Sequence, residues 1–263
     1  MKTILLTGST DGIGLETAKM LAKEGHFLLL HGRSREKLNR VQEQIKIINP
    51  KIMVETYVAD LSILSEVQKL GQEILNYGTT LDVIINNAGV FVMENPITKD
   101  KLDARFVVNT IAPYLLTKIL LPSMNPEGRV VNVSSAAQAP VNCNLIRTGG
   151  RVSDGEAYAQ SKLAIIMWSM ELAKENPDKV IVSVNPKSFL GSKMVKQAYG
   201  REGYDLAIGA DILCRAALSN EFLDANGKYY DNDTCRFANP EPSALNETNR
   251  EKLMNTLEQI VGS

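Results

Sequence analysis

The sequence predicts a single α/β domain over residues 1–263, in which a doubly wound sheet of about seven mostly parallel strands is flanked by helices. Short β-rich runs alternate with stretches of helical periodicity along most of the chain. Two of these runs, at residues 3–7 and 129–133, are apolar on consecutive positions, as strands buried on both faces of a parallel sheet are. No internal repeat or Pro/Gly-rich linker marks a domain boundary.

The predicted elements follow one another in a regular order. Strands are expected at Thr3–Thr7, Phe27–His31, Ile52–Val58, Asp82–Ile85, Arg129–Ser134 and Val180–Val184, with a weaker one at Lys228–Tyr230. Helices are expected at Ile13–Glu24, Glu36–Ile47, Leu64–Asn76, Leu102–Leu121, Ala157–Lys174 and Asp205–Leu218.

Two irregular stretches, 136–156 and 186–203, follow strand ends, and a C-terminal extension covers about 231–263. Ligands of such sheets bind beyond the carboxyl ends of the strands. We therefore expect these two stretches to wall and cover a substrate pocket, with surface decoration as the alternative.

Composition excludes several classes of protein. The chain has 29 Lys and Arg against 30 Asp and Glu, so it offers no cationic field for nucleic acid. Three cysteines without CxxC spacing and two histidines disfavour a disulfide framework, a metal site and a Ser-His-Asp triad. No apolar run reaches the roughly 18 residues of a membrane span, and the N-terminus does not resemble a signal peptide. We expect a cytoplasmic protein without a membrane span.

A glycine-rich run follows the first strand and leads into the first helix. Glycines at this position let the backbone approach a pyrophosphate, and the helix N-terminus offers free N–H groups. The run therefore predicts a dinucleotide site. Its expected contacts are Gly8, Ser9, Thr10, Asp11, Gly12, Ile13 and Gly14.

The end of the second strand favours NADP over NAD. An NAD site places Asp or Glu there, whereas this chain has Arg33 and Ser34, with no acid before Glu36. Arg33 can stack on adenine and pair with a 2′-phosphate, and Ser34 can donate a hydrogen bond. The alternative is that Arg33 and Arg35 are solvated charges at a helix start, and the nearby carboxylate of Asp11 weakens the NADP interpretation slightly.

The third and fourth strands end in further candidate contacts. Asp60, followed by Leu61, can accept a hydrogen bond from the adenine amino group. The small turn formed by Asn87, Ala88 and Gly89 lets the backbone reach the adenosine ribose. Plain turn chemistry is the alternative for both.

The reacting centre is predicted at Tyr158 and Lys162, which share one helix face at i,i+4. A second Tyr-x-x-x-Lys element, Tyr114 and Lys118, lies late in a helix and so at the opposite edge of the sheet, which predicts a structural role. Lys162 and an oxidised nicotinamide both favour the phenolate of Tyr158, so this residue can exchange a proton near neutral pH. Ser135 can hydrogen-bond the substrate oxygen, and Asn109 can hold a water that connects Lys162 to solvent.

The ordered set of these motifs resembles the short-chain dehydrogenase/reductase family. Residues 107–122 and 158–173 look most like its retinol-dehydrogenase-like branch, whose members typically prefer NADP. The resemblance implies a Rossmann-type fold and an NAD(P)-dependent oxidoreductase acting on CH–OH and C=O groups. It also implies a catalytic tetrad of Asn109, Ser135, Tyr158 and Lys162, with Tyr158 and Lys162 also contacting the cofactor. The family commonly dimerises through two long central helices, so a homo-oligomer is expected.

The chain departs from the family after the sixth strand. The usual Pro-Gly is Pro186-Lys187 here, and the usual Thr is Gly191, with a hydroxyl one residue later at Ser192. Cofactor contacts are still expected at Pro186 and Ser188.

The sequence thus predicts an NADP-dependent oxidoreductase for a small carbonyl or secondary alcohol, with Tyr158 as general acid/base. Two alternatives are a non-catalytic dinucleotide-binding sensor or scaffold, and an enzyme acting on an activated sugar. Apolar side chains in the two irregular stretches suit a hydrophobic substrate. The alternative, given equal weight, is that they pack these stretches onto the body of the protein. They are Val141, Leu145, Ile146, Phe189, Leu190 and Met194.

Overall fold

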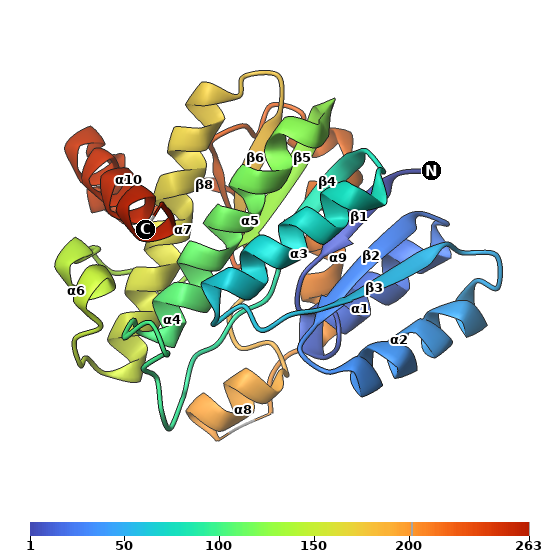
Figure 1. Ribbon diagram of the computed structural model, residues 1–263, viewed down its shortest axis with the longest axis horizontal. Coiled ribbons are helices and arrows are strands. Elements are labelled where there is room, and N and C mark those ends of the chain that lie inside the picture. The colour runs from blue at the N-terminus through green and yellow to red at the C-terminus, as the bar shows by residue number, and fades with distance from the viewer. Residues whose placement is uncertain (201, 263) are drawn as a thin grey trace.

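A computed structural model describes residues 1–200 and 202–262 and contains one eight-stranded sheet between two layers of helices (Figure 1). Arg201, within the predicted loop 186–203, and Ser263, which ends the predicted extension, lie outside the described residues. The strand order is β3-β2-β1-β4-β5-β6-β7-β8, in which β8 alone of the described strands runs antiparallel to its neighbour. The strands are β1 (Thr3–Leu6), β2 (Phe27–Gly32), β3 (Val54–Val58), β4 (Leu81–Asn86), β5 (Met124–Val133), β6 (Val180–Asn185), β7 (Tyr229–Asp231) and β8 (Arg236–Ala238). The predicted doubly wound α/β fold is confirmed.

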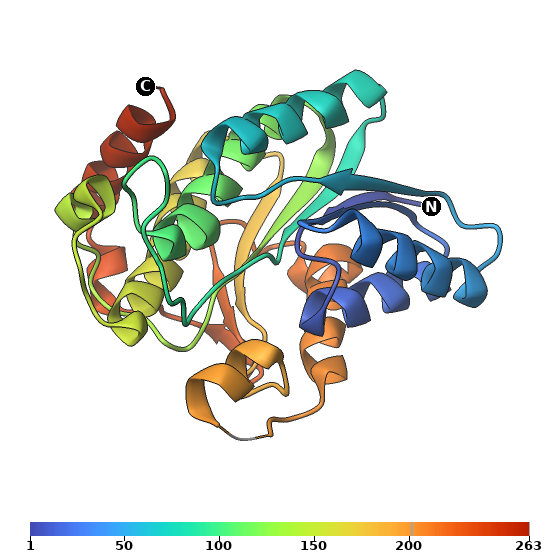
Figure 2. The ribbon, with the colours of Figure 1, turned by 60° about the horizontal axis from the view of Figure 1, so that its bottom comes forward.

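Side chains from alternate positions of each strand enter two separate cores. Leu5 and Val130 face one layer, made of α3 (Leu64–Tyr77), α5 (Ala112–Leu120) and α7 (Asp154–Glu175). Leu6 and Val131 face the other layer, made of α1 (Gly12–Lys23), α2 (Arg35–Ile48) and α9 (Leu206–Leu218). Figure 2 shows the sheet running between these layers. Because both faces of the central strands are buried, their sequences are apolar without alternation.

One crossover helix contains a π-helical turn. α4 (Ala104–Phe106), the π-helical segment η1 (Val107–Ile111), α5 and the 3₁₀ turn η2 (Leu121–Ser123) form one continuous helical stretch. Contrary to the expectation that no apolar run reaches the length of a membrane span, Ala104–Ser123 is apolar and long enough to cross a membrane, but 78% of its most apolar window is buried inside the protein. Such burial is what the central helix of a packed α/β domain requires. Single-turn π segments are found frequently at functional sites.

The structure corrects several predicted boundaries. The predicted irregular stretch 136–156 contains a short helix, α6 (Cys143–Thr148), and the first turn of α7, which begins at Asp154 rather than Ala157. α6 is too short to show a periodicity, and it is held by its cap: the side chain of Asn142 accepts hydrogen bonds from the backbone of Asn144 and Leu145. The eighth strand, β8, was not predicted either, because three residues carry no alternation signal.

The C-terminal extension packs against its own chain. It contains the 3₁₀ turn η4 (Pro242–Leu245), after β8, and ends in α10 (Glu247–Val261), whereas the 3₁₀ turn η3 (Asn220–Phe222) lies before β7 and outside the extension. Glu258 of α10 accepts hydrogen bonds from the hydroxyl of Tyr114 and from the ammonium of Lys118. Arg250 pairs with Glu171 of α7. The second Tyr-x-x-x-Lys element therefore serves to dock the C-terminal helix, as its predicted structural role requires.

Candidate active site

A cavity of about 900 Å³ opens at the carboxyl ends of the central strands. Its walls are the loops that follow the strands β1 to β6, together with α8 (Lys193–Tyr199). β1 pairs with β2 on one side and with β4 on the other, so the cavity lies where the strand order reverses. Ligands of open α/β sheets bind at this position.

The glycine-rich turn gives the cavity a floor made of backbone. Gly8 has a φ of +67°, and a Cβ there would lie 2.8 Å from the Cα of Ala88. A Cβ on Gly14 would lie 2.2 Å from the carbonyl oxygen of Gly8. Gly12, at a φ of +54°, has no neighbour closer than the Cβ of Ser192 at 3.8 Å. Glycine is thus required sterically at two positions, and the backbone near the third is left open to a ligand.

The neutral ring of His31 holds the glycine-rich turn in place through hydrogen bonds. Its Nδ1 accepts a hydrogen bond from the backbone N–H of Gly8 at 3.3 Å, and its Nε2 donates to the carbonyl of Ala59 at 3.0 Å. Burial lowers the pKa of His31 to about 4, so the ring is neutral at physiological pH. The hydroxyl of Ser9 is also buried and donates to the carbonyl of His31.

The loop after β4 braces the glycine-rich turn through side chains. The amide nitrogen of Asn87 donates to the carbonyls of Thr7 and Gly8, at 2.9 and 3.1 Å. The hydroxyl of Thr7 accepts hydrogen bonds from the backbone of Asn87 and Ala88. Two loops that are separated by about eighty residues thereby form one rigid wall.

Basic side chains gather at the end of the cavity next to β2. Arg33 and Lys37 line it, whereas Glu36 pairs with Arg40 at 2.5 Å. Ser34 caps α2 by accepting a hydrogen bond from the backbone of Lys37. Lys37 was not named from the sequence, although its position one turn into the helix after Arg33 was a usable signal.

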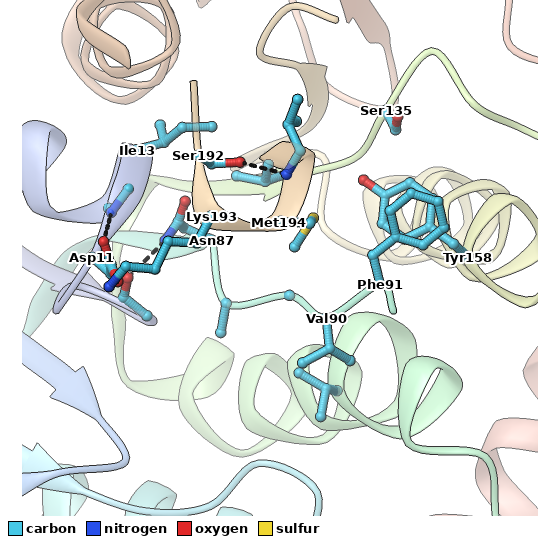
Figure 3. A pocket seen from close by; sticks show the side chains of 18 of the residues that line it. Asp11, Ile13, Asn87, Val90, Phe91, Ser135, Tyr158, Ser192, Lys193 and Met194 are labelled. Carbon is cyan, nitrogen blue, oxygen red and sulfur yellow. Dashed lines mark hydrogen bonds and ion pairs between the residues drawn. The ribbon is translucent and has the colours of Figure 1, made fainter. Parts of the chain in front are cut away.

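Two carboxylates also line this end of the cavity. Asp60 and Leu61 both reach the wall, and Asp60 accepts a hydrogen bond from the backbone of Ser62 at 2.9 Å. Asp11 pairs with Lys193 at the start of α8. Although burial opposes the shift, the hydrogen bonds from Lys193 and the backbone of Gly12 lower the pKa of Asp11. The contact joins the glycine-rich turn to α8 above it (Figure 3).

Tyr158 and Lys162 lie together at the other end of the cavity. Lys162 is only 3% exposed, its ammonium donates to the carbonyl of Val133 at 2.7 Å, and it lies 5.6 Å from the centre of the Tyr158 ring. Burial lowers the pKa of Lys162 to about 8. Figure 3 shows Ser135 on the side toward which the Tyr158 hydroxyl points. Ser135 also accepts a hydrogen bond from the backbone of Ala137 at 3.1 Å.

Asn109 stands behind this group, in the π-helical turn. Its side-chain amide accepts from the backbone N–H of Val90 at 2.8 Å and donates to the carbonyl of Val90 at 2.9 Å. It also donates to the hydroxyl of Ser161, which in turn donates to the carbonyl of Tyr158. The side chain of Asn109 therefore fixes the loop after β4 against the helix that carries Tyr158.

An aromatic stack was missed from the sequence. The rings of Phe91 and Tyr158 lie with their centroids 4.3 Å apart and their planes at 29° (Figure 3). Phe91 lies two residues beyond Gly89, the last residue of the turn after β4, and lines the cavity. Its apolar character directly after that turn was the available signal.

The segment after β6 explains the two departures noted in the sequence. Lys187 has a φ of +123°, so it takes a backbone conformation suited to glycine. Gly191 donates to the carbonyl of Tyr204, and a Cβ on Gly191 would lie 3.1 Å from that oxygen. Ser192 caps α8 by accepting from the backbone of Val195. A close backbone pairing thus occupies the position of the usual Thr, and the shifted hydroxyl caps the helix that covers the cavity.

Most of the residues predicted from the sequence line the cavity. These are Gly8, Thr10, Asp11, Gly12, Ile13, Gly14, Arg33, Asp60, Leu61, Asn87, Ala88, Gly89, Ser135, Tyr158, Lys162, Pro186 and Ser188. Ser9, Ser34 and Asn109 are absent from its wall in the part of the chain that the structure describes. Their side chains cap, buttress or clamp the backbone instead.

The wall suits a dinucleotide. The turn that a Cβ would fill provides space and N–H groups for a pyrophosphate, and the basic group at Arg33 and Lys37 suits further phosphate. Among the described residues, no group of three or more His, Cys, Asp or Glu side chains could hold a metal ion. The chemistry available at the far end is proton transfer by Tyr158 beside a buried ammonium.

Comparison with known proteins agrees with this geometry. A family model described as short chain dehydrogenase matches residues 2–202. The chain is 30% identical over 286 residues to the short-chain dehydrogenase TIC 32 A, chloroplastic, of Brassica napus, covering 99% of this chain and 89% of that protein. It is 26% identical to retinol dehydrogenase 13 of Homo sapiens, covering 99% and 85% respectively. The solved structure of landomycin C-6 ketoreductase LanV with bound NADP and rabelomycin has a TM-score of 0.69 at 27% identity, covering 88% of this chain and 94% of that one.

Proposed function

Because this chain belongs to the short-chain dehydrogenase/reductase family and is an NAD(P)-dependent oxidoreductase, we propose that it uses NADP and that Tyr158 is its general acid and base. The observation that carries the proposal is the placement of Tyr158, Lys162 and Ser135 at one end of a cavity whose other end is basic. Retinol-dehydrogenase-like relatives agree with the branch expected from the sequence.

The basic end of the cavity supports NADP. Arg33 and Lys37 supply two cations where an NAD site has a carboxylate. The carboxylates nearby are engaged, since Asp11 pairs with Lys193 and Asp60 accepts from the backbone of Ser62. A 2′-phosphate placed there gains charge-assisted hydrogen bonds from Arg33 and Lys37. LanV, with bound NADP, is a related structure.

The catalytic end supports proton exchange at one oxygen atom. NADPH, when bound, supplies the hydride that reduces the carbonyl carbon. Tyr158 donates its phenolic proton to the carbonyl oxygen, while Ser135 donates a hydrogen bond to the same oxygen. The phenolate left on Tyr158 is stabilised by the ammonium of Lys162, which the carbonyl of Val133 holds in place. In the direction of oxidation, Tyr158 takes the proton from the alcohol.

The substrate is proposed to be a hydrophobic carbonyl compound or alcohol. Seven apolar side chains from the loop after β4 and the segment after β6 line the cavity: Val90, Phe91, Val92, Met93, Phe189, Leu190 and Met194. Val92 and Phe189 are also 44% and 38% exposed, so the apolar surface continues to the mouth. Retinol dehydrogenase 13 is named for an alcohol of this kind.

A cytoplasmic location, a single folding domain and a homo-oligomer remain proposals from the sequence.

The test is turnover by the purified protein with NADPH and a panel of hydrophobic ketones, aldehydes and quinones, followed by the absorbance of reduced nicotinamide. Tyr158→Phe is expected to lower kcat by about a hundredfold to ten-thousandfold, because it removes the exchangeable proton. The matched control is Tyr114→Phe, in the second Tyr-x-x-x-Lys element, which is expected to keep its activity. Binding of NADPH without turnover on any compound would favour the non-catalytic sensor instead.

A further inference from the structure

A buried cation joins the two helices that carry the predicted catalytic residues. Arg105 is 1% exposed and forms a two-pronged pair with Asp103: Nε to Oδ1 at 2.9 Å and Nη2 to Oδ2 at 2.5 Å. Its remaining terminal nitrogen, Nη1, donates to the carboxylate of Asp154, the first residue of α7. One guanidinium thus binds a carboxylate on its own segment and a carboxylate on a helix forty-nine residues away.

The spacing of this pair matches the spacing of the catalytic residues. Arg105 precedes Asn109 by one helical turn, and Asp154 precedes Tyr158 by one helical turn. A second link between the same helices lies just beyond Tyr158, where Asn109 donates to the hydroxyl of Ser161 at 3.0 Å. Tyr158 therefore lies between two polar links that tie α7 to the neighbouring helical stretch.

Apart from its N-terminal cap, in which Ser153 accepts a hydrogen bond from the backbone of Glu156 at 3.2 Å, the first turn of α7 has few contacts that hold it in place. From Gln160 to Ser169 every residue of the helix is buried, but Gly155 and Glu156 are exposed. Gly155 is a poor helix former, with no neighbour within 4 Å of where its Cβ would be. Ala157 is the one buried apolar side chain of this turn among the described residues. Packing alone thus leaves the turn that carries the Tyr158 backbone weakly fixed.

The Asp103 pair makes Arg105 a rigid donor. Hydrogen bonds from Arg105 to Asp103 raise the pKa of the guanidinium, so it stays charged. Two of its nitrogens are held in the plane of the Asp103 carboxylate, which aims the remaining terminal nitrogen at α7. An ion pair whose one member is preorganised and buried loses less to side-chain entropy than an exposed pair does.

We propose that Arg105 and Asp154 are positioning residues that fix the first turn of α7 and so place the Tyr158 hydroxyl toward Ser135 and the substrate oxygen. The proposal rests on the proposed function of Tyr158. A shift of the reacting group by about 1 Å can lower the rate by about a hundredfold. An ion pair that fixes the helix one turn before Tyr158 can therefore affect the rate through the position of the Tyr158 hydroxyl.

The test uses Asp154→Ala, with Glu156→Ala as its matched control. Both remove one carboxylate, and its interaction with the helix dipole, from the first turn of α7. Glu156 accepts a side-chain hydrogen bond from Gln160 of the same helix at 3.2 Å, so its removal leaves the link between the two helices in place. Arg105 itself is left in place, because its removal would leave Asp103, at 1% exposure, as a buried charge without its partner. Turnover with NADPH, thermal unfolding and amide hydrogen exchange over residues 157–161 are measured on the full chain.

For Asp154→Ala we expect kcat to fall about tenfold relative to Glu156→Ala, with the KM for NADPH within about twofold. Amide exchange over residues 157–161 should rise about tenfold while the unfolding midpoint matches that of the control. Adding Gly155→Ala to Asp154→Ala should restore part of both changes, because it stiffens the turn where a Cβ has free space.

Equal kcat and equal exchange in the two variants would overturn the proposal, and so would faster exchange with unchanged kcat. Should the wild type turn over none of the compounds, the role of Tyr158 falls separately. Hydrogen exchange then tests separately whether the Arg105–Asp154 pair fixes the first turn of α7. Unchanged protection in Asp154→Ala would show that it does not.

Discussion

The ring of Phe91 lies on the ring of Tyr158, with the centroids 4.3 Å apart and the planes inclined at 29°. The backbone of Val90, next to Phe91, is held at both N–H and C=O by the amide of Asn109. The proposed general acid therefore has an aromatic neighbour whose own position is fixed by a third residue of the site. Such stacking restricts rotation of the Tyr158 ring and forms an apolar wall beside its hydroxyl.

Phe91→Ala is expected to lower kcat/KM for the best substrate of the panel by about tenfold, since an aromatic pair contributes about 0.5–1.5 kcal/mol beyond its buried area. Phe91→Tyr keeps the stacked ring and is expected to retain most of the activity. Steady-state kinetics of the two variants provides the measurement. Equal losses in both variants would show that the stack does not matter.

Arg33→Ala is expected to weaken binding of NADPH by about tenfold to a hundredfold and to leave binding of NADH nearly unchanged. The reason is that the hydrogen bonds of a charged pair to the 2′-phosphate are worth about 1.5–3 kcal/mol. Dissociation constants measured by calorimetry check this directly.

Arg35→Ala is the control for the cofactor prediction. Arg35 carries the same charge two residues later, but it donates to the hydroxyl of Thr56 at 3.0 Å and is absent from the cavity wall in the described part of the chain. It is expected to bind both cofactors as the wild type does. If Arg33→Ala and Arg35→Ala weaken NADPH equally, net charge rather than a phosphate site is responsible.

Local motifs were the part of this molecule that the sequence predicted well. The alternation of strands and helices and the glycines at 8, 12 and 14 depend on neighbouring residues only, so the fold class and the floor of the cavity were predictable. Choosing Tyr158 over Tyr114 needed only the direction of a crossover helix relative to the sheet.

Contacts between distant segments could not be predicted in the same way. The pairs Arg105–Asp154 and Tyr114–Glu258 join residues 49 and 144 positions apart, and no local pattern marks either. The stack on Tyr158 likewise depends on how the loop after β4 folds back. The π-helical turn at Asn109 was invisible because its composition is that of an ordinary buried helix.

Lys187 stores backbone strain that a glycine would release. A residue with a side chain at a φ of +123° costs about 1–3 kcal/mol, and glycine avoids this while losing about 0.5–1 kcal/mol of chain entropy. A cation–π contact offsets part of this strain, because the ammonium of Lys187 lies 5.3 Å from the centre of the Tyr204 ring. Comparing two variants that both lack the ammonium isolates the backbone effect.

Lys187→Gly is therefore expected to be more stable than Lys187→Ala by about 1 kcal/mol in urea unfolding. The control is Lys196 in the helix α8, where the usual order should hold and alanine should be the more stable variant. If the alanine variant were more stable than the glycine variant at both positions, the backbone of Lys187 would not be strained.

Lys162 is a residue whose function is expected to oppose stability. Lys162 is buried, and burial lowers the pKa of its ammonium from 10.5 to about 8. The unfolded chain therefore binds the proton more tightly than the folded chain does between pH 8 and 10.5. Keeping the ammonium inside the protein costs on the order of 3 kcal/mol below pH 8, by the free energy of 1.36 kcal/mol per pKa unit.

Lys162→Met keeps the length of the apolar stem and removes the charge. We expect this variant to lose activity and yet to exceed the wild type in free energy of unfolding at pH 7, by up to about 3 kcal/mol. As the pH rises from 8 toward 10.5, the wild type loses the cost of the buried charge, so the difference between the two proteins should shrink. Denaturant unfolding at pH 7 and at pH 10 measures this difference. A gap that stays constant with pH would mean that the Val133 carbonyl and its surroundings stabilise the ammonium fully.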